Sequence, residues 1–376
     1  MASLVLRLLT VTIFLSAPAA LAATLAAAVT PVVKSTTSYG VLSNPGLTRD
    51  SCSSSLWNNN VLWVCRDTEQ LNSAGNPVLP LVVNTASYSS MPNAPSNPQP
   101  LSLTSPQGFG SPFYPLESDE CPTSGACSDG TRWVGWPDTG PVVTFRGSGG
   151  NTNAYAFISR NHLSGLSQIN TPSYSLYHLL SQSSGPMPSV SLAVSSFWSS
   201  SQIGYGSAAS VVMNGYAYLY GATPDGKLAL ARAAQTGFLG ALDDKSLYEY
   251  YVNGAWTRTA PSRTASNIAL PNTSSAQGTI YWSPKWNSYV WIGGDGFPNA
   301  NFFISTAPNP EGPWTAATRF YTGTVGNGSL GAYSTVAHPS LTDGTGNYVF
   351  ITWTRTNKNS AGVEVYDQPL VRVDWQ

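Results

Sequence analysis

The chain has 376 residues, of which 42% are hydrophobic and only 9% are charged, with 17 Lys and Arg against 18 Asp and Glu. An average soluble domain carries roughly 25% charged residues, so the polarity of this chain comes mainly from uncharged side chains. Its formal net charge of −1 excludes a basic surface for nucleic acid, and no Lys/Arg-rich amphipathic stretch indicates membrane binding. The 34 glycines and 28 prolines interrupt nearly every window that a long helix needs.

The first residues have the pattern of a secretory leader. An apolar run from Leu8 to Leu15 precedes Ala20-Leu21-Ala22, a small-x-small cleavage site. The alternative is a membrane anchor, which Pro18 disfavours because it ends the apolar run before that run is long enough to span a bilayer. We therefore expect a signal peptide at residues 1–23 and a secreted, extracellular mature chain at residues 24–376.

Secretion fits the cysteine content, because disulfides persist in oxidising compartments. The four cysteines allow three pairings. We favour Cys52–Cys65 and Cys121–Cys127, since each pair is local and brackets a turn-rich segment. Two sequons in Gly/Ser-rich stretches predict N-glycosylation at Asn272 and Asn327.

One pattern recurs along the chain: a short β-rich run, a turn containing Asn or Gly, and a second apolar run. It occurs at Ser51–Cys65, Ser207–Tyr220, Gly278–Ile292 and Tyr333–Trp353. Asn214-Gly215 between two apolar runs is the strongest of these hairpin signals. We expect a fifth hairpin that pairs Thr131–Trp136 with Val142–Phe145. Successive units begin tens of residues apart, which suits the four-stranded sheets of a propeller.

The second run of these pairs is apolar without alternation, as in Val61-Leu62-Trp63-Val64. Such a strand is covered on both faces, as in blades packed against neighbouring blades. Sandwich strands that face water on one side alternate instead. We therefore expect an all-β fold, a single five-bladed β-propeller with long inter-blade loops; a large β-sandwich is the alternative.

The first hairpin brings two aspartates together. If Cys52 lies opposite Cys65, the numbers of paired residues sum to 117, and two residues outward Asp50 falls opposite Asp67 on the same face. Opposed residues have Cβ atoms ~4.5–5.5 Å apart, where like charges are destabilising. Such a pair shares a proton, binds a cation or does chemistry. The alternative is that each carboxylate is a solvated strand-end cap beside an arginine.

Paired carboxylates are the machinery of glycosidases, at ~5–5.5 Å for retaining and ~6.5–9.5 Å for inverting mechanisms. Because the two side chains can splay, the sequence does not choose between these separations. It also does not assign the acid and the base or nucleophile between Asp50 and Asp67.

The run from Arg49 to Thr68 resembles the opening blade of the secreted proteins of domain-of-unknown-function family 4185. Further similar stretches follow in order, at Asp119–Cys121, Gly135–Asp138, Tyr248–Trp256, Pro308–Trp314 and Tyr333–Pro339. The resemblance implies a five-bladed propeller related to furanoside-cleaving hydrolases, among them endo-acting D-arabinofuranan hydrolases of glycoside hydrolase family 183. It also implies that Asp50 and Asp67, which match the family's two aspartates in order and approximate spacing, carry the chemistry.

Further residues are candidates for substrate binding. Trp136 and Asp138 stand two positions apart, and an apolar ring beside a carboxylate is a common sugar platform; the alternative is a Pro-Asp turn. Tyr205, Gln277 and Tyr333 stand at the starts of expected inner strands, which converge at one mouth of a propeller channel.

His338 is the remaining candidate ligand and one of only three histidines. It is suited to donate to a sugar or to orient an acid; the alternative is a buried histidine whose hydrogen bonds are satisfied. Three histidines without shared spacing disfavour a catalytic zinc site, and we expect no metal ligands and no required cofactor. A structural cation in the channel is left open.

Together these features predict a secreted, monomeric glycoside hydrolase that cleaves a furanose-containing, D-arabinan-like polysaccharide, with endo action expected. One rival is a non-catalytic carbohydrate-binding propeller. The Arg-Asp pairs occur on the first blade only, which favours one asymmetric site over the repeated pockets of a lectin. Another rival is an exo-acting arabinofuranosidase or galactofuranosidase, because loop shape decides between endo and exo action.

Overall fold

The computed structural model describes residues 29–105, 109–121, 125–182, 185–235 and 240–376. The expected signal peptide and its cleavage site lie outside the described residues. Within them the regular structure is almost entirely strand, with short 3₁₀ turns at Ser148–Gly150, Lys245–Leu247 and Pro339–Leu341. No helix in this part of the chain is long and apolar enough to cross a membrane. The prediction of an all-β fold is confirmed.

Five antiparallel sheets form the body of the described chain. The first contains β3 (Cys52–Trp57), β4 (Asn60–Cys65) and β7 (Thr85–Ser89). The second contains β9 (Val142–Arg146), β10 (Asn151–Ser159), β13 (Tyr174–Gln182) and β14 (Ser189–Trp198). The third contains β15 (Ala209–Met213), β16 (Tyr216–Ala222), β17 (Leu228–Ala234), β18 (Tyr248–Val252) and β19 (Ala255–Thr257).

The last two sheets complete the body. The fourth contains β20 (Gly278–Ser283), β21 (Ser288–Gly294), β22 (Asn301–Ala307) and β23 (Thr318–Thr322). The fifth contains β24 (Ala332–His338), β25 (Tyr348–Lys358), β27 (Pro369–Trp375) and β1 (Val33–Val41), while β26 (Glu364–Asp367) also pairs with β25.

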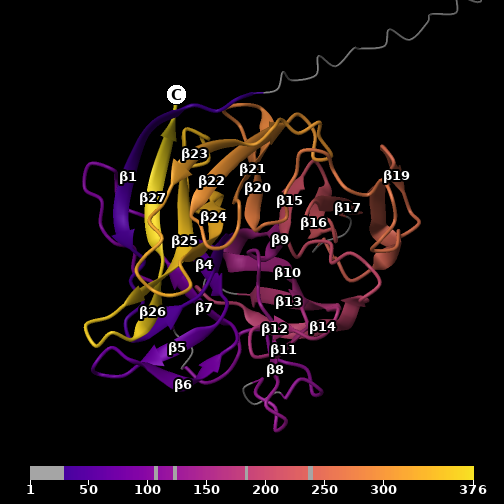
Figure 1. The fold of residues 1–376 in the computed structure, drawn as a ribbon. Coiled ribbons are helices and arrows are strands. Elements are labelled where there is room, and N and C mark those ends of the chain that lie inside the picture. Colours follow the sequence, from indigo (N-terminus) through magenta and orange to yellow (C-terminus); the bar gives the residue numbers. More distant parts are fainter. Residues whose placement is uncertain (1–28, 106–108, 122–124, 183–184, 236–239) are drawn as a thin grey trace, which may run out of the picture.

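These sheets are arranged in a closed ring. Their first strands contact one another in cyclic order, from β3 to β9, β15, β20 and β24, and β24 returns to β3. The ends of the chain meet in the fifth sheet, where β1 pairs antiparallel with β27 and Val33 lies opposite Trp375 (Figure 1). This arrangement is the one that the propeller prediction requires.

Four of the five expected hairpins form, and the fifth was wrong. Thr131–Trp136 does not pair with Val142–Phe145; β9 pairs instead with β10, and β8 (Arg132–Val134) pairs with β11 (Asn161–Ser164). Pro137 and Pro141 separate the two runs, and proline has no N–H to donate to a strand ladder. The turn of the true hairpin contains Gly149 at φ 74°, a backbone conformation that favours glycine.

Two small sheets stand beside the ring and connect to its first two sheets. One contains β2 (Leu47–Arg49), β5 (Thr68–Leu71) and β6 (Pro77–Val82); the other contains β8, β11 and β12 (Ser167–Gln168). The first small sheet extends the hairpin that carries both aspartates. In the second small sheet, β8 ends two residues before Trp136. Both therefore position side chains of the candidate site.

Packing between the sheets follows the apolar pattern. Val61 to Cys65 of β4 are all buried, as the run without alternation predicts. Trp291 and Trp314 are buried among neighbouring apolar side chains. The side chains expected at the surface also lie there: Asn272 and Asn327 are both exposed, and glycosylation of these two residues stays a prediction.

Candidate active site

Both expected disulfides are present, between Cys52 and Cys65 and between Cys121 and Cys127. The first joins directly opposed residues of β3 and β4, so the predicted register of this hairpin is confirmed. The disulfides are also consistent with a secreted protein.

The same register continues outward from the disulfide to the two aspartates. The backbone N–H of Asp50 donates to the carbonyl of Asp67 at 2.8 Å. One residue further, Arg49 of β2 lies opposite Thr68 of β5. Asp50 and Asp67 therefore face each other across the chain at the junction between the first sheet of the ring and the small sheet.

A bulge interrupts the ladder at this junction. Ser51 has φ 41°, and the N–H of Arg66 donates to the carbonyls of both Asp50 (2.9 Å) and Ser51 (3.3 Å). Bulges re-aim side chains and are common beside active sites. Left-handed backbone also occurs at the start of three other first strands, with φ 89° at Gly206, 49° at Gln277 and 55° at Ser334.

Asp50 is buried, with 7% of its surface exposed. Its carboxylate accepts hydrogen bonds from the hydroxyls of Ser51 and Tyr333, but its Oδ1 atom has no hydrogen-bond partner among the described residues. Burial raises the pKa of Asp50 from 3.8 to about 6; Arg66 opposes this rise and Asp67 adds to it. About half of this side chain is therefore a carboxylic acid at pH 6, and about a tenth of it still holds a proton at pH 7.

Asp67 is held by two donors from the loop region around β8. A guanidinium N–H of Arg132 donates to Oδ2 at 2.5 Å, and the indole N–H of Trp136 donates to Oδ1 at 2.9 Å. The two aspartates thus differ: Asp50 is desolvated and incompletely bonded, whereas Asp67 is ion-paired and oriented. Pairs of carboxyl groups in different environments are the usual basis for assigning acid and base roles.

A third carboxylate, that of Asp138, lies beside the pair. Nε of Arg66 donates to Asp138 Oδ1 at 2.9 Å, and the guanidinium of Arg66 lies 5.4 Å from the ring centroid of Trp136. Trp136 and Asp138 therefore lie beside the two aspartates and contact the charged groups there, and their role in substrate binding stays a prediction. Each ion-paired aspartate has its own arginine, so the charges of the site largely cancel.

A cavity of 260 Å³ opens next to these groups, with Arg66, Gln277 and Tyr333 among its lining residues. Gln277 and Tyr333 thus line one cavity beside Arg66, and their role as sugar ligands stays a prediction. Phe297 also lines the cavity; its side chain is 60% exposed, and its ring centroid lies 5.7 Å from that of Tyr333.

Arg132, Phe297 and Tyr366 are site residues that the sequence analysis missed. Burial raises the pKa of Tyr366, and the charges of Asp50 and Asp67 add to that rise. No sequence signal marks Arg132 or Tyr366, because their partners are distant in the chain. Phe297 had a signal, an aromatic residue in a Gly-Asp-Gly-Phe-Pro loop between two strands.

Two expected ligands lie in the core instead. Tyr205 is 2% exposed and packs against Trp198 and Tyr250, with ring centroids 5.5 Å and 5.4 Å away. The tyrosine precedes the left-handed residue Gly206, which begins the bulge ahead of the first strand. The expectation that Tyr205 reaches the channel mouth is therefore corrected.

His338 is fully buried between the fifth and first sheets. Its Nε2 lies 2.7 Å from the hydroxyl of Thr352 and its Nδ1 lies 2.7 Å from the hydroxyl of Ser54. Burial lowers the pKa of His338 to about 3, so the ring is neutral. This is the alternative of a satisfied core histidine, and His338 is corrected from a ligand to a packing residue.

Within the described residues, no group of three or more His, Cys, Asp or Glu side chains gathers in a way that could hold a metal ion. The expectation of no metal ligands and no required cofactor stays a prediction, and a structural cation in the channel stays open.

Solved structures include proteins with a similar fold. The protein of Bacteroides ovatus ATCC 8483 described as a "putative hydrolase" is 14% identical, with 86% of this chain and 85% of that chain covered and a TM-score of 0.56. This likeness shows a shared fold. A family 117 glycoside hydrolase of Zobellia galactanivorans (10% identity, 90% of both chains, TM-score 0.49) and a GH43_1 enzyme of Xanthomonas citri (9%, 88% and 89%, 0.44) are more distant and carry no argument.

The family is shown by a sequence match that covers more than half of the chain. Residues 129–369 match the model described as domain of unknown function DUF5005, and the chain belongs to that family. The matching model is not that of family 4185, so the narrower resemblance stays a prediction. No curated protein matches the chain.

Proposed function

We propose that the protein is a secreted glycoside hydrolase that cleaves a furanose-containing, D-arabinan-like polysaccharide within its chain. The observation that carries the proposal is the pairing of a buried Asp50 with an ion-paired Asp67 across one bulged hairpin, beside a cavity at the mouth of the ring. The preference for furanose rests on the resemblance of Arg49–Thr68 to family 4185.

In the proposed mechanism Asp50 is the general acid. Its raised pKa of about 6 keeps a proton available for the leaving glycosidic oxygen. Asp67, oriented by Arg132 and Trp136, acts on the anomeric carbon, either directly as a nucleophile or through a water as a base. Tyr333 acts as a positioning residue, because its hydroxyl holds the carboxyl of Asp50.

The cavity beside the aspartates supplies sugar contacts in this proposal. The exposed ring of Phe297 offers an apolar surface for a sugar face, and Gln277 offers a donor and an acceptor for hydroxyls. Because Arg66 and Arg132 are already paired with Asp138 and Asp67, the site favours a neutral glycan over a charged one.

Replacement of each aspartate tests the proposal directly. We expect Asp50→Asn and Asp67→Asn to reduce polysaccharide hydrolysis by about 10²–10⁴-fold, the usual contribution of a general acid or base. Hydrolysis is measured as release of reducing ends, and folding is checked by thermal melting. Glu249→Gln is the matched control, because Glu249 pairs with Arg232 on an outer strand. If both folded aspartate variants keep full activity, the assignment is wrong.

A panel of polysaccharides tests the substrate. Arabinan, galactofuranan and two pyranose polymers are incubated with the protein, and the products are sized. Endo action on a furanoside gives products of mixed length, whereas the exo-acting rival releases short products from chain ends. Binding without any release of reducing ends supports the carbohydrate-binding rival instead.

A further inference from the structure

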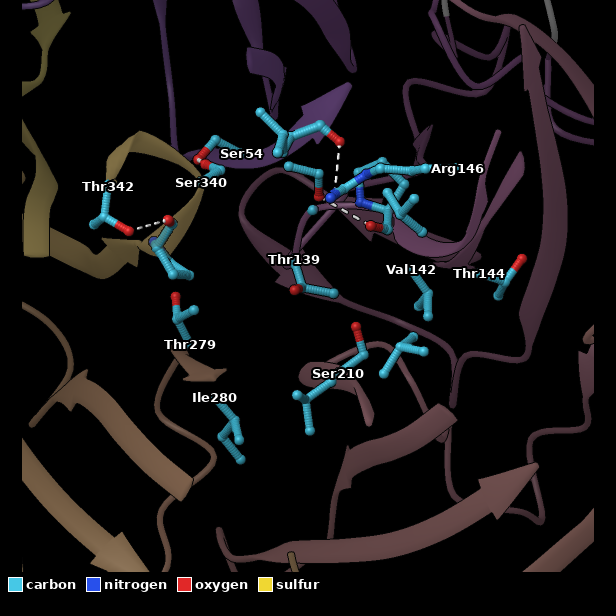
Figure 2. Close-up of a pocket in the computed structure, with 18 of the residues that line it drawn as sticks. Ser54, Thr139, Val142, Thr144, Arg146, Ser210, Thr279, Ile280, Ser340 and Thr342 are labelled. Carbon is cyan, nitrogen blue, oxygen red and sulfur yellow. Dashed lines mark hydrogen bonds between the residues drawn. The ribbon is translucent and has the colours of Figure 1, made fainter. Parts of the chain in front are cut away.

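A second cavity, of 710 Å³, lies at the other end of the ring from the proposed catalytic groups. In three sheets the lining residues come later in the chain than the residues around the aspartates: Ser54 follows Asp50, Thr279 follows Gln277, and Ser340 follows Tyr333. Figure 2 shows this cavity with side chains around it. The first four sheets each contribute a hydroxyl to the lining, from Ser54, Thr144, Ser210 and Thr279, and Ser340 adds a fifth from the 3₁₀ turn that follows β24.

Part of this hydroxyl ring is engaged within the protein, and part is available. Ser54 and Ser340 share a hydrogen bond at 2.6 Å, and Thr279 donates to the carbonyl of Ala337 at 2.9 Å. The hydroxyls of Ser210 and Thr139, both in the lining, have no hydrogen-bond partner among the described residues. These two groups can each donate and accept, as a ligand rich in hydroxyls requires.

The remaining lining completes a surface for a sugar. Val142, Ile280 and Leu56 supply aliphatic area between the hydroxyls. Arg146 holds its guanidinium against the carbonyl of Leu56 at 3.0 Å and has no acidic partner in the described part of the chain. The side chain of Asp343 already accepts hydrogen bonds from Thr345. Pockets that combine apolar walls with a few placed polar groups, at about 300–1,000 Å³, are typical of small-ligand sites.

We propose that this cavity is a second saccharide-binding site, which holds a segment of neutral oligosaccharide without cleaving it. Among the described residues Asp343 is the only carboxylate in the lining, so this site lacks the carboxyl pair of a glycosidase and would bind without hydrolysing. The proposal goes beyond the hydrolase function and does not depend on it. In a hydrolase, such a site would keep a polysaccharide attached to the protein while the other mouth of the ring acts on it.

Titration of a protein that cannot hydrolyse its ligand tests the inference. Neutral arabino-, galacto- and xylo-oligosaccharides are titrated into the Asp50→Asn variant by calorimetry, with oligogalacturonate as the charged comparison. We expect at least one neutral oligosaccharide to bind at the second site. Adding Ser210→Leu, which fills the cavity, should weaken that binding by at least tenfold, whereas Ser210→Ala should weaken it by about 2- to 10-fold, as for one lost hydrogen bond.

Two controls separate the two mouths of the ring. Phe297→Ala alters only the cavity beside the aspartates, so it should leave the second-site affinity unchanged. Ser210→Leu in the otherwise unaltered protein should leave hydrolysis of a short soluble substrate unchanged. If Ser210→Leu does not fold, Thr139→Leu takes its place. The inference is overturned if no neutral oligosaccharide binds, or if the binding is lost with Phe297→Ala and kept with Ser210→Leu. If the protein binds an oligosaccharide at the second site but has no hydrolytic activity, the hydrolase proposal is contradicted and the second-site inference stands.

Discussion

Asp50 is the residue where stability and chemistry oppose each other. Its carboxyl is buried, one oxygen lacks a hydrogen-bond partner among the described residues, and Arg66 offsets the cost of its charge only in part. Buried charges without full compensation are destabilising. A protein that keeps such a group gains a carboxylic acid that is still half protonated at about pH 6, which is what acid catalysis of glycoside cleavage needs.

This conflict predicts that Asp50→Asn stabilises the fold, and only at higher pH. Because burial raises the folded-state pKa from 3.8 to about 6, the folded protein binds more protons than the unfolded chain between these values. The free energy of unfolding therefore falls as pH rises through this window. Asn carries no charge, so at pH 7.5 the variant should be more stable by about 1–3 kcal/mol, with no gain at pH 4.

Chemical denaturation at pH 4, 5, 6 and 7.5 measures this difference. Asp67→Asn is the matched control, since it breaks the ion pair with Arg132 and should lower stability at pH 7.5. A stability difference between Asp50→Asn and the wild type that does not change with pH would contradict the burial argument.

At the scale of single elements, the β3–β4 hairpin determines where the two aspartates stand. Asn58 has φ 51° in its turn, a conformation that Asn tolerates better than most residues. The disulfide between Cys52 and Cys65 then holds the register that places Asp50 opposite Asp67. A slip of one residue in this hairpin would turn each side chain to the other face.

Removal of this disulfide should therefore affect both stability and activity. The two cysteines are 13 residues apart, and closing a loop of this length stabilises a fold by about 3 kcal/mol. We expect the double variant Cys52→Ala/Cys65→Ala to lose about that much stability and most of its hydrolytic activity. The disulfide between Cys121 and Cys127 closes a shorter loop, with a separation of 6. The double variant Cys121→Ala/Cys127→Ala should therefore lose less stability and keep its activity. Equal effects of the two double variants on activity would contradict the positioning role.

At the scale of the whole molecule, closure of the ring joins the two ends of the chain. β1 is the outer strand of a sheet whose other strands come from the last residues of the chain. Every sheet in the ring packs against two neighbours, and β1 contributes Val33 and Tyr39 to two apolar clusters that include residues of the fifth sheet, so loss of this strand uncovers part of both. Scarce charge is also organised at this scale, because Asp50, Asp67 and Asp138 gather with Arg66 at one mouth.

Truncation tests the closure. A chain that begins after Val41 lacks β1. Its melting temperature should be about 10 °C below that of the full chain, because several kcal/mol of sheet pairing and packing are lost. A chain that begins at Val29 keeps β1 and should melt like the longer protein. Thermal melting by circular dichroism compares the two, and equal melting temperatures would show that β1 does not close the ring.

The sequence by itself determined the features that depend on neighbouring residues. Turns at Asn58 and Asn214 and the apolar runs beside them predict the hairpins, and the local cysteine pairs predict both disulfides. From the first disulfide, the period of two in a strand places Asp50 opposite Asp67. These inferences held because each depends on a few consecutive residues and on backbone geometry.

Only the tertiary structure decided what lies around that pair. Arg132 contacts Asp67 across 65 positions of sequence, and Ser54 contacts His338 across 284. No local pattern encodes such contacts. The sequence therefore does not determine how deeply Tyr205 and His338 are buried, which strand pairs with Val142–Arg146, or that β1 closes the ring. The reason is physical: alternation fixes which face a side chain takes, while burial depends on which sheet covers that face.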